Sequence, residues 1–269
     1  MNEQPVYIVS DHTGLTAESV ARSLLAQFEG FEFRYELRPF MDQEKIELLR
    51  QELQKVAEKG LRPLVFSTLA RPELLEPLSE TPAVLFDLFG PYLKRLEEAL
   101  GQPPARRPGR YHGIEDPLSY FQRIEAVDFA LATDDGLGGE RYGRAEVILI
   151  GVSRAGKTPT CLFLALQHGI KAANYPLTEE DLNQLALPSS LKPHRAKLYA
   201  LTIEPERLAQ IRASRRPGSV YASLERCRWE VGRAEALFRQ EGILVFETTR
   251  ASVEEIAAGL LQHLGRRKG

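Results

Sequence analysis

The sequence has few of the features that mark disulfide-rich, membrane-spanning or strongly charged proteins. Its only cysteines, Cys161 and Cys227, stand far apart with no Cys-x-x-Cys pair or histidine-rich neighbourhood, which argues against a disulfide framework and a zinc site. The formal net charge is only -2, so no overall positive field would attract nucleic acid or an acidic membrane. No apolar run is long enough to span a bilayer, and no basic segment leads into one near the amino terminus. We therefore expect a cytoplasmic protein with reduced thiols and no nucleic-acid or membrane partner.

The order of apolar patterns predicts an α/β fold with a mainly parallel sheet. Hydrophobic residues make up 43% of the 269 residues and charged residues 27%, as in ordinary folded proteins. In the first half, short β-branched or apolar runs that predict strands alternate with stretches of helical spacing. The expected strands lie at 6–9, 63–68 and 84–88. One helix is expected to begin at Thr16, and a second is expected over 42–59. Such alternation favours parallel strands with helices packed on the sheet.

A proline-rich stretch divides the chain. Residues 101–110 contain three prolines and no large apolar side chain, so they cannot belong to a core. A helix over 120–132, which we expect to bridge the two halves, and a glycine-rich turn follow. We expect an N-terminal α/β domain over 1–144 with a linker near 101–110, and a C-terminal P-loop kinase-like domain over 145–269. The later strands are expected at 147–150, 170–173, 197–202 and 243–247, with a closing helix over 252–264.

A phosphate-binding loop (P-loop) pattern follows the apolar run 147–150. It fits Gly-x-x-x-x-Gly-Lys-Thr over Gly151, Val152, Ser153, Arg154, Ala155, Gly156, Lys157 and Thr158. The glycines let the backbone curl so that N–H groups point inward, and the start of the next helix adds partial positive charge where phosphates would lie. Lys157 would neutralise the terminal phosphates, and the Thr158 hydroxyl would bind Mg²⁺. This pattern predicts a nucleotide-dependent phosphotransferase.

Pro159 departs from the usual loop. Proline is tolerated in the first turn of a helix, but it supplies no N–H. One donor that many P-loops point at the nucleotide is therefore missing. We interpret this as a sign that the inner phosphate is held differently, as would suit a donor shorter than a triphosphate.

Several segments resemble one known family. They are GVSRAGKTPTCLFLALQHGIKAANYP at 151–176, VSDHTGLTAE near the amino terminus, YFQRIEAVDFALATDDG at 120–136, SLKPHRAKLYALTIEPERLAQIR at 190–212, YASLERCRWEV at 221–231 and SVEEIA at 252–257. Together they are similar to the regulatory proteins of phosphoenolpyruvate synthase and of pyruvate, phosphate dikinase. The later segments favour the regulators of phosphoenolpyruvate synthase.

The resemblance implies a bifunctional enzyme. It would phosphorylate a threonine near the catalytic histidine of phosphoenolpyruvate synthase with ADP as donor. It would reverse this with inorganic phosphate, releasing pyrophosphate. The resemblance also implies a homodimer, with pyruvate, phosphate dikinase as the alternative target.

Carboxylates that could act as a base lie after predicted strands or in a turn. Transfer to a hydroxyl needs a carboxylate within hydrogen-bond reach, and Mg²⁺ needs oxygen ligands. Asp11, the pair Asp134 and Asp135, and Glu204 meet this description, and we favour Asp135. The alternatives remain open, because Asp-Gly often marks a solvated turn and Asp11 could cap its own loop. The catalytic candidates are therefore Lys157, Asp135 and Asp11, together with Arg154, an anion contact inside the P-loop.

A basic run follows the expected strand at 197–202. Its members are Arg207, Arg212, Arg215 and Arg216. The run could close over a transferring phosphate as a lid hinged at Pro217-Gly218, or it could be a solvated helix face. Two other functions also stay open: a kinase of small metabolites using ATP, and a nucleotide sensor without catalysis.

Overall fold

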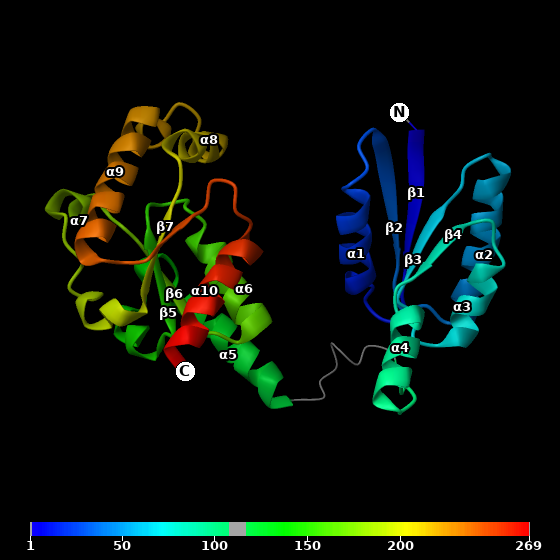
Figure 1. The fold of residues 1–269 in the computed structure, drawn as a ribbon. Helices are drawn as coiled ribbons and strands as arrows, with labels where there is room; N and C mark the ends of the chain where they lie inside the picture. The colour runs from blue at the N-terminus through cyan, green and yellow to red at the C-terminus, as the bar shows by residue number, and fades with distance from the viewer. Residues whose placement is uncertain (1, 108–116, 269) are drawn as a thin grey trace. The chain divides into compact units, whose positions relative to one another are not determined.

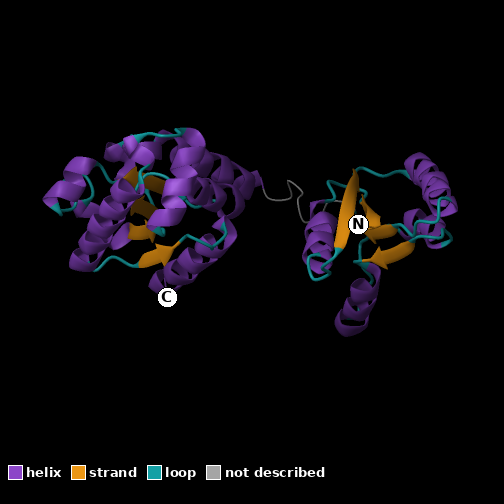
Figure 2. Ribbon diagram, turned by 90° about the horizontal axis from the view of Figure 1, so that it is seen from above, coloured by secondary structure: helices purple, strands orange, loops and turns teal. Residues whose placement is uncertain are grey.

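The computed structural model describes residues 2–107 and 117–268. The chain divides into two compact units, Met1–Glu115 and Asp116–Gly269, which are coloured from blue to green and from green to red in Figure 1. Each unit contains one four-stranded parallel sheet flanked by helices, as Figure 2 shows with the strands in orange. The expected α/β class is confirmed.

The boundary between the units lies earlier in the chain than the expected one at residue 144. Helix α5 (Pro117–Ala132) packs against α6 (Lys157–His168) and β6 (Ala172–Pro176), so it belongs to the second unit and does not bridge two halves. Its buried residues Ala126 and Phe129 lie in the core of that unit. The last three residues of the expected linker, 108–110, fall outside the described residues.

The first unit follows the alternating order that the sequence predicts. Its strands are β1 (Asn2–Val9), β2 (Phe31–Arg38), β3 (Leu64–Ser67) and β4 (Val84–Asp87). Its helices are α1 (Leu15–Leu25), α2 (Gln43–Glu58), α3 (Pro72–Ser79) and α4 (Gly90–Leu100). Helix α2 begins where Asp42 accepts a hydrogen bond of 2.9 Å from the Lys45 amide, which satisfies one of the free donors of its first turn.

The first sheet has the strand order β2-β1-β3-β4. Helix α1 packs on one face through Ala17, Ala21 and Leu25, whereas α2 and α3 cover the other face. The chain moves from β1 to one neighbour and then crosses back to the other. The loop after β1 therefore leaves the carboxyl edge at the point where the strand order reverses, which is where open α/β sheets bind ligands.

The second unit repeats this arrangement. Its strands are β5 (Val147–Gly151), β6, β7 (Leu198–Thr202) and β8 (Val245–Glu247), in the order β6-β5-β7-β8. Its further helices are α7 (Glu179–Gln184), α8 (Pro205–Arg215), α9 (Leu224–Glu241) and α10 (Val253–Lys268), with short 3-10 turns η1 (Asp134–Gly136), η2 (Gly139–Arg144), η3 (Lys192–Lys197) and η4 (Val220–Ala222).

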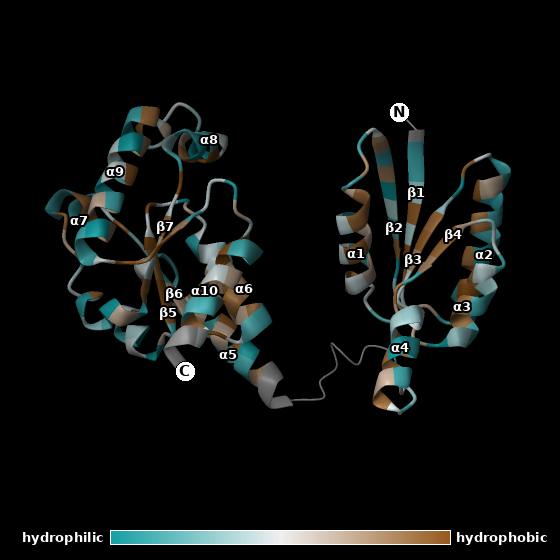
Figure 3. Ribbon diagram, in the orientation of Figure 1, coloured by the Kyte–Doolittle hydropathy of each residue, from teal (hydrophilic) through white to brown (hydrophobic). Residues whose placement is uncertain are grey.

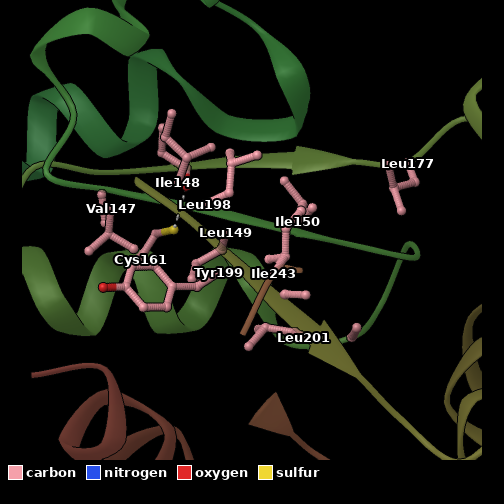
Figure 4. Close-up of a cluster of buried hydrophobic side chains, with 14 of the residues drawn as sticks. Val147, Ile148, Leu149, Ile150, Cys161, Leu177, Leu198, Tyr199, Leu201 and Ile243 are labelled. Carbon is pink, nitrogen blue, oxygen red and sulfur yellow. Dashed lines mark hydrogen bonds between the residues drawn. The ribbon is translucent and has the colours of Figure 1, made fainter. Parts of the chain in front are cut away.

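The core of the second unit forms around β5. All five residues of this strand are buried, because helices cover both faces of the sheet. Figure 4 shows Val147 to Ile150 beside Tyr199 of β7 and Cys161 of α6. Both cysteines are buried free thiols, as predicted. Among the described residues, no helix is both long and apolar enough to cross a membrane.

Candidate active site

The P-loop connects the central strand β5 to α6. Gly151 has φ 155°, and a side-chain carbon there would lie 2.4 Å from the carbonyl oxygen of Leu201. Gly156 has φ 88° at the start of the helix. Both positions need glycine, the first because of close backbone approach and the second because of its left-handed conformation. Arg154 adopts φ 76° without being glycine, and its side chain is exposed on the loop.

The amides of this loop are open to an anion. Of the residues between β5 and α6, Ala155 alone donates its N–H within the loop, to the Val152 carbonyl at 3.3 Å. The amides of Ser153, Arg154 and Gly156 have no acceptor among the described residues. The first turn of α6 adds partial positive charge at the same place. This is the arrangement that polyphosphate binding requires.

Lys157 lies beneath the loop rather than extending into solvent. Its side chain is buried, with 4% exposed, and Nζ donates to the Val152 carbonyl at 2.8 Å. Burial lowers the pKa of this ammonium to about 8, although the nearby carboxylates of Asp135 and Asp134 oppose the change. A buried ammonium that has one protein acceptor keeps two further protons for an anion.

Asp134 and Thr158 form the candidate metal site. Thr158 Oγ1 donates to Asp134 Oδ1 at 2.8 Å, and the same carboxylate oxygen accepts from the amide group of Asn174, a buried residue of β6. A hydroxyl and a carboxylate beside a phosphate loop are the oxygen ligands that Mg²⁺ takes, with phosphates and waters completing its shell. These residues fit the ion, and Thr158 was the ligand expected from the sequence.

Asp135 differs from its neighbour. It is exposed and has φ 50°, and its backbone N–H donates to Asn174 Oδ1 at 3.2 Å. Asn174 therefore holds both aspartates, one through each end of its side-chain amide. Asp134 points to Thr158 while the Asp135 carboxylate stays accessible and close enough to influence Lys157.

Replacing Asp134 and Asp135 separately is expected to divide their roles. Asp134→Asn should weaken Mg²⁺-dependent nucleotide binding by about tenfold or more, because a charged metal ligand is lost. Asp135→Asn should leave binding nearly unchanged and lower the turnover rate. Calorimetric titration of ADP with and without Mg²⁺, together with rate measurements, checks both. Equal effects of the two variants on binding would contradict the division.

The other two candidate carboxylates belong to residues with structural contacts of their own. Asp11 belongs to the first unit, where Oδ2 accepts from the Ala70 N–H at 2.9 Å and so joins the loops after β1 and β3. This contact gives Asp11 a structural role between two loops, which differs from the capping of its own loop that the sequence suggested. Glu204 is exposed before α8, and its N–H donates to Thr249 Oγ1 at 2.8 Å.

The basic run divides in the structure. Arg207, Arg215 and Arg216 are exposed on or after α8, whereas Arg212 is completely buried. Its Nη2 donates to the Ser153 carbonyl at 3.1 Å and to Glu230 Oε2 at 2.6 Å, and Nη1 donates to the Tyr221 carbonyl at 3.0 Å. Arg212 therefore supports the P-loop from the protein interior. The prediction of a lid that includes Arg212 is wrong.

Tyr221 makes a second link between η4 and the loop. Its hydroxyl lies 2.9 Å from Ser153 Oγ, and its ring lies under the Arg212 guanidinium at 4.0 Å. Ser153 is thus held through both its carbonyl and its hydroxyl. These two contacts fix the backbone at Ser153 and Arg154 without occupying the N–H groups of either residue.

One family model covers most of the chain. The model described as kinase/pyrophosphorylase matches residues 6–261. The chain belongs to the kinase/pyrophosphorylase family. A relative from Deinococcus radiodurans is 53% identical over 99% of this chain and 98% of its own, and one from Alkalilimnicola ehrlichii is 50% identical over 95% and 94%. Another from Aromatoleum aromaticum is 49% identical over 96% and 94%, and all three bear the name "Putative phosphoenolpyruvate synthase regulatory protein".

A distant similarity adds nothing to this assignment. A solved periplasmic solute-binding protein of an ABC transporter from Actinobacillus succinogenes, with bound D-allose, is 10% identical over 98% of this chain and 92% of its own. Its TM-score of 0.21 is too low to indicate a common fold. Membership in the kinase/pyrophosphorylase family identifies this protein as a kinase-type enzyme, which agrees with the sequence prediction.

Some residues around the loop of this kinase/pyrophosphorylase had no sequence signal of their own. Asn174 lies in strand β6 and Glu230 in helix α9. The periodicity of the sequence assigns such residues only to the core or to a polar face. Tyr221 lies in a short 3-10 turn after the basic run. These residues reach the P-loop from distant parts of the sequence. Glu230, for example, binds Arg212, which in turn binds Ser153, 77 positions before Glu230. Only the fold shows such contacts.

Proposed function

We propose that this protein regulates phosphoenolpyruvate synthase by reversible phosphorylation of a threonine. The kinase/pyrophosphorylase family and the names of the relatives support the target and the two opposed activities. The observation that carries the proposal is the set of open amides of Ser153, Arg154 and Gly156 near the buried ammonium of Lys157, next to the Asp134 and Thr158 oxygens. A cytoplasmic location and a homodimer belong to the same proposal.

In the forward direction the threonine hydroxyl attacks the β-phosphorus of ADP. The bond between that phosphorus and the bridging oxygen breaks, AMP leaves, and the hydroxyl proton passes to a carboxylate. We assign that proton to Asp135, because its carboxylate is exposed beside the loop whereas Asp11 is engaged with Ala70. Lys157 and Arg154 stabilise the charge on the transferred group. Thr158 and Asp134 would hold Mg²⁺, which would neutralise part of the phosphate charge when bound.

In the reverse direction inorganic phosphate takes the place of the hydroxyl. An oxygen of phosphate attacks the phosphothreonine phosphorus, the bond to the threonine oxygen breaks, and pyrophosphate forms while the threonine regains its proton. Phosphate and the nucleotide β-phosphate have the same charge and shape, so one set of open amides is suited to both. We therefore place both reactions at the P-loop.

ADP is expected to bind more tightly than ATP. Pro159 is exposed in the first turn of α6 and removes one N–H that a longer polyphosphate would use. Calorimetry with each nucleotide measures the preference. Pro159→Ala restores the donor, so the ratio of ATP to ADP affinity should rise in this variant. A clear preference of the unchanged protein for ATP would contradict the proposal.

The activity test combines the protein, ADP and purified phosphoenolpyruvate synthase. AMP and a phosphorylated threonine on the synthase are the expected products, and added phosphate should then yield pyrophosphate. Substitution of pyruvate, phosphate dikinase for the synthase tests the alternative target. A small-metabolite kinase would consume ATP without either protein, and a sensor would bind nucleotide without turnover.

A further inference from the structure

One face of the first sheet is only partly covered by helices. Helix α1 packs over the central strands β1 and β3, and residues from all four strands border the space beside its exposed last turn. A groove of about 430 Å³ runs there, lined almost entirely by apolar side chains. Among these, Leu24, Phe28, Phe31 and Phe86 are exposed, and the rings of Phe66 and Phe86 stack at 4.5 Å. A contiguous apolar groove of this kind marks an interaction surface.

Helix α4 of the same unit has an apolar stripe and no buried residue in its whole described length. Tyr92, Leu96 and Leu100 recur every four residues, so they share one side of the helix. They are 64%, 51% and 71% exposed. Figure 1 shows α4 extending past the carboxyl ends of the strands, and Figure 3 shows apolar segments in brown on α4, β3 and β4.

The second unit shows what covers the fourth strand in a sheet of the same strand order. There α10 follows the fourth strand, packs against α6 and buries Ile256, Ala257 and Leu260. Gly259 of α10 lies so close to Phe246 of β8 that a side-chain carbon would come within 2.7 Å of its ring. In the first unit α4 holds the corresponding place in the chain, yet it does not cover Phe86 of β4.

The connection before α4 keeps the helix away from its own sheet. Only Leu88 and Phe89 separate β4 from α4, whereas residues 248–252 separate β8 from α10. Asp87 Oδ1 also accepts from the N–H groups of Phe89 and Gly90, at 3.1 and 2.9 Å. Turning α4 back over its own groove would break both bonds within a two-residue connection.

We propose that α4 docks in the groove of a second copy of this chain, and that the two copies exchange their α4 helices reciprocally. Three side chains of α4 and four of the groove each leave on the order of 100 Å² to be covered. One helix in one groove then removes roughly 700 Å² from water, and the reciprocal pair about 1,400 Å², which lies within the range of specific stable interfaces. This interface deepens the homodimer of the proposed function and depends on no catalytic step.

The test measures the mass of the full chain in solution, without nucleotide or target, by light scattering and sedimentation at micromolar concentration. The unchanged protein is expected to be a dimer. Leu96→Asp with Leu100→Asp places two carboxylates in the apolar groove, so the dissociation constant of the dimer should rise by at least about a hundredfold. Leu48→Asp is the matched control, because Leu48 is an equally exposed leucine on α2, on the other face of the sheet.

A cross-link distinguishes exchange from folding back. The native cysteines are buried, so Leu96→Cys and Phe86→Cys can be introduced on separately tagged chains and joined with a short bis-maleimide. Exchange predicts a covalent link between two chains, each with one new cysteine. A monomeric full chain, a dimer unaffected by the two aspartates, or a link formed only within a doubly substituted chain would each overturn the proposal. The kinase assay is independent of these outcomes.

Discussion

Lys157→Met is expected to lower ADP-dependent transfer at least about a hundredfold while the protein remains folded. The ammonium lies near the open amides of the loop, with one proton donated to the Val152 carbonyl. Methionine fills nearly the same buried space, so the loop keeps its packing and loses only the charge that stabilises the transferred phosphoryl group. The rate of AMP formation with phosphoenolpyruvate synthase measures the loss.

The same variant is expected to be at least as stable as the unchanged protein. Burial lowers the pKa of Lys157 from 10.5 to about 8, so holding its charge costs the folded state roughly 3 kcal/mol. Below pH 8 the lysine is protonated in the folded and the unfolded chain, and the whole cost is present. Between pH 8 and 10.5 the unfolded chain keeps the proton that the folded chain has released, so the free energy of unfolding rises with pH.

Denaturant unfolding of both proteins from pH 7 to 10.5, without nucleotide, checks this linkage. The difference in stability between Lys157→Met and the unchanged protein should shrink as the pH rises. Lys171→Met is the control, because Lys171 belongs to the same unit and pairs with Glu125 at 2.7 Å away from the loop. Normal activity of Lys157→Met, or loss of activity only through unfolding, would contradict the role of the ammonium.

The sequence predicted the parts of the site that are local in the chain. A buried strand, two glycines at special backbone positions, a lysine and a threonine all lie within twelve residues, and each local requirement favours the same strand-loop-helix turn. The four strands of the second unit were expected within about three residues of their positions, because apolar runs buried on both sides give a strong pattern. The fold class followed from their alternation with helices.

The sequence could not supply what depends on tertiary contacts. Strand β2 has the pattern FEFRYELR, with charged residues at alternate positions on an exposed edge, and was not expected. Helix α5 was expected, but its packing against α6 was not, so the boundary was placed too late. Arg212 was grouped with exposed arginines because its burial depends on Glu230 and on carbonyls from two other segments.

Glu230→Ala is expected to have the largest effect on stability, a loss of about 3–5 kcal/mol. Its carboxylate accepts from the buried Arg212 at 2.6 Å and from Arg226 Nε at 2.8 Å. Removing it leaves the Arg212 charge buried without a counter-ion, which a low-dielectric interior does not tolerate. Denaturant unfolding measures the loss. Glu206→Ala is the matched control, because Glu206 forms an exposed pair with Arg228 and its removal should change stability little.

The double variant Arg212→Met, Glu230→Met separates stability from loop position. Replacing both members of a buried ion pair by apolar residues should restore most of the stability lost in Glu230→Ala. The Ser153 and Tyr221 carbonyls, however, still lack the donors that Arg212 gave them, so the loop amides lose their support. ADP affinity should therefore stay about tenfold or more below that of the unchanged protein even in the restabilised variant. Full recovery of ADP binding together with stability would mean that Arg212 serves the core alone and does not position the loop.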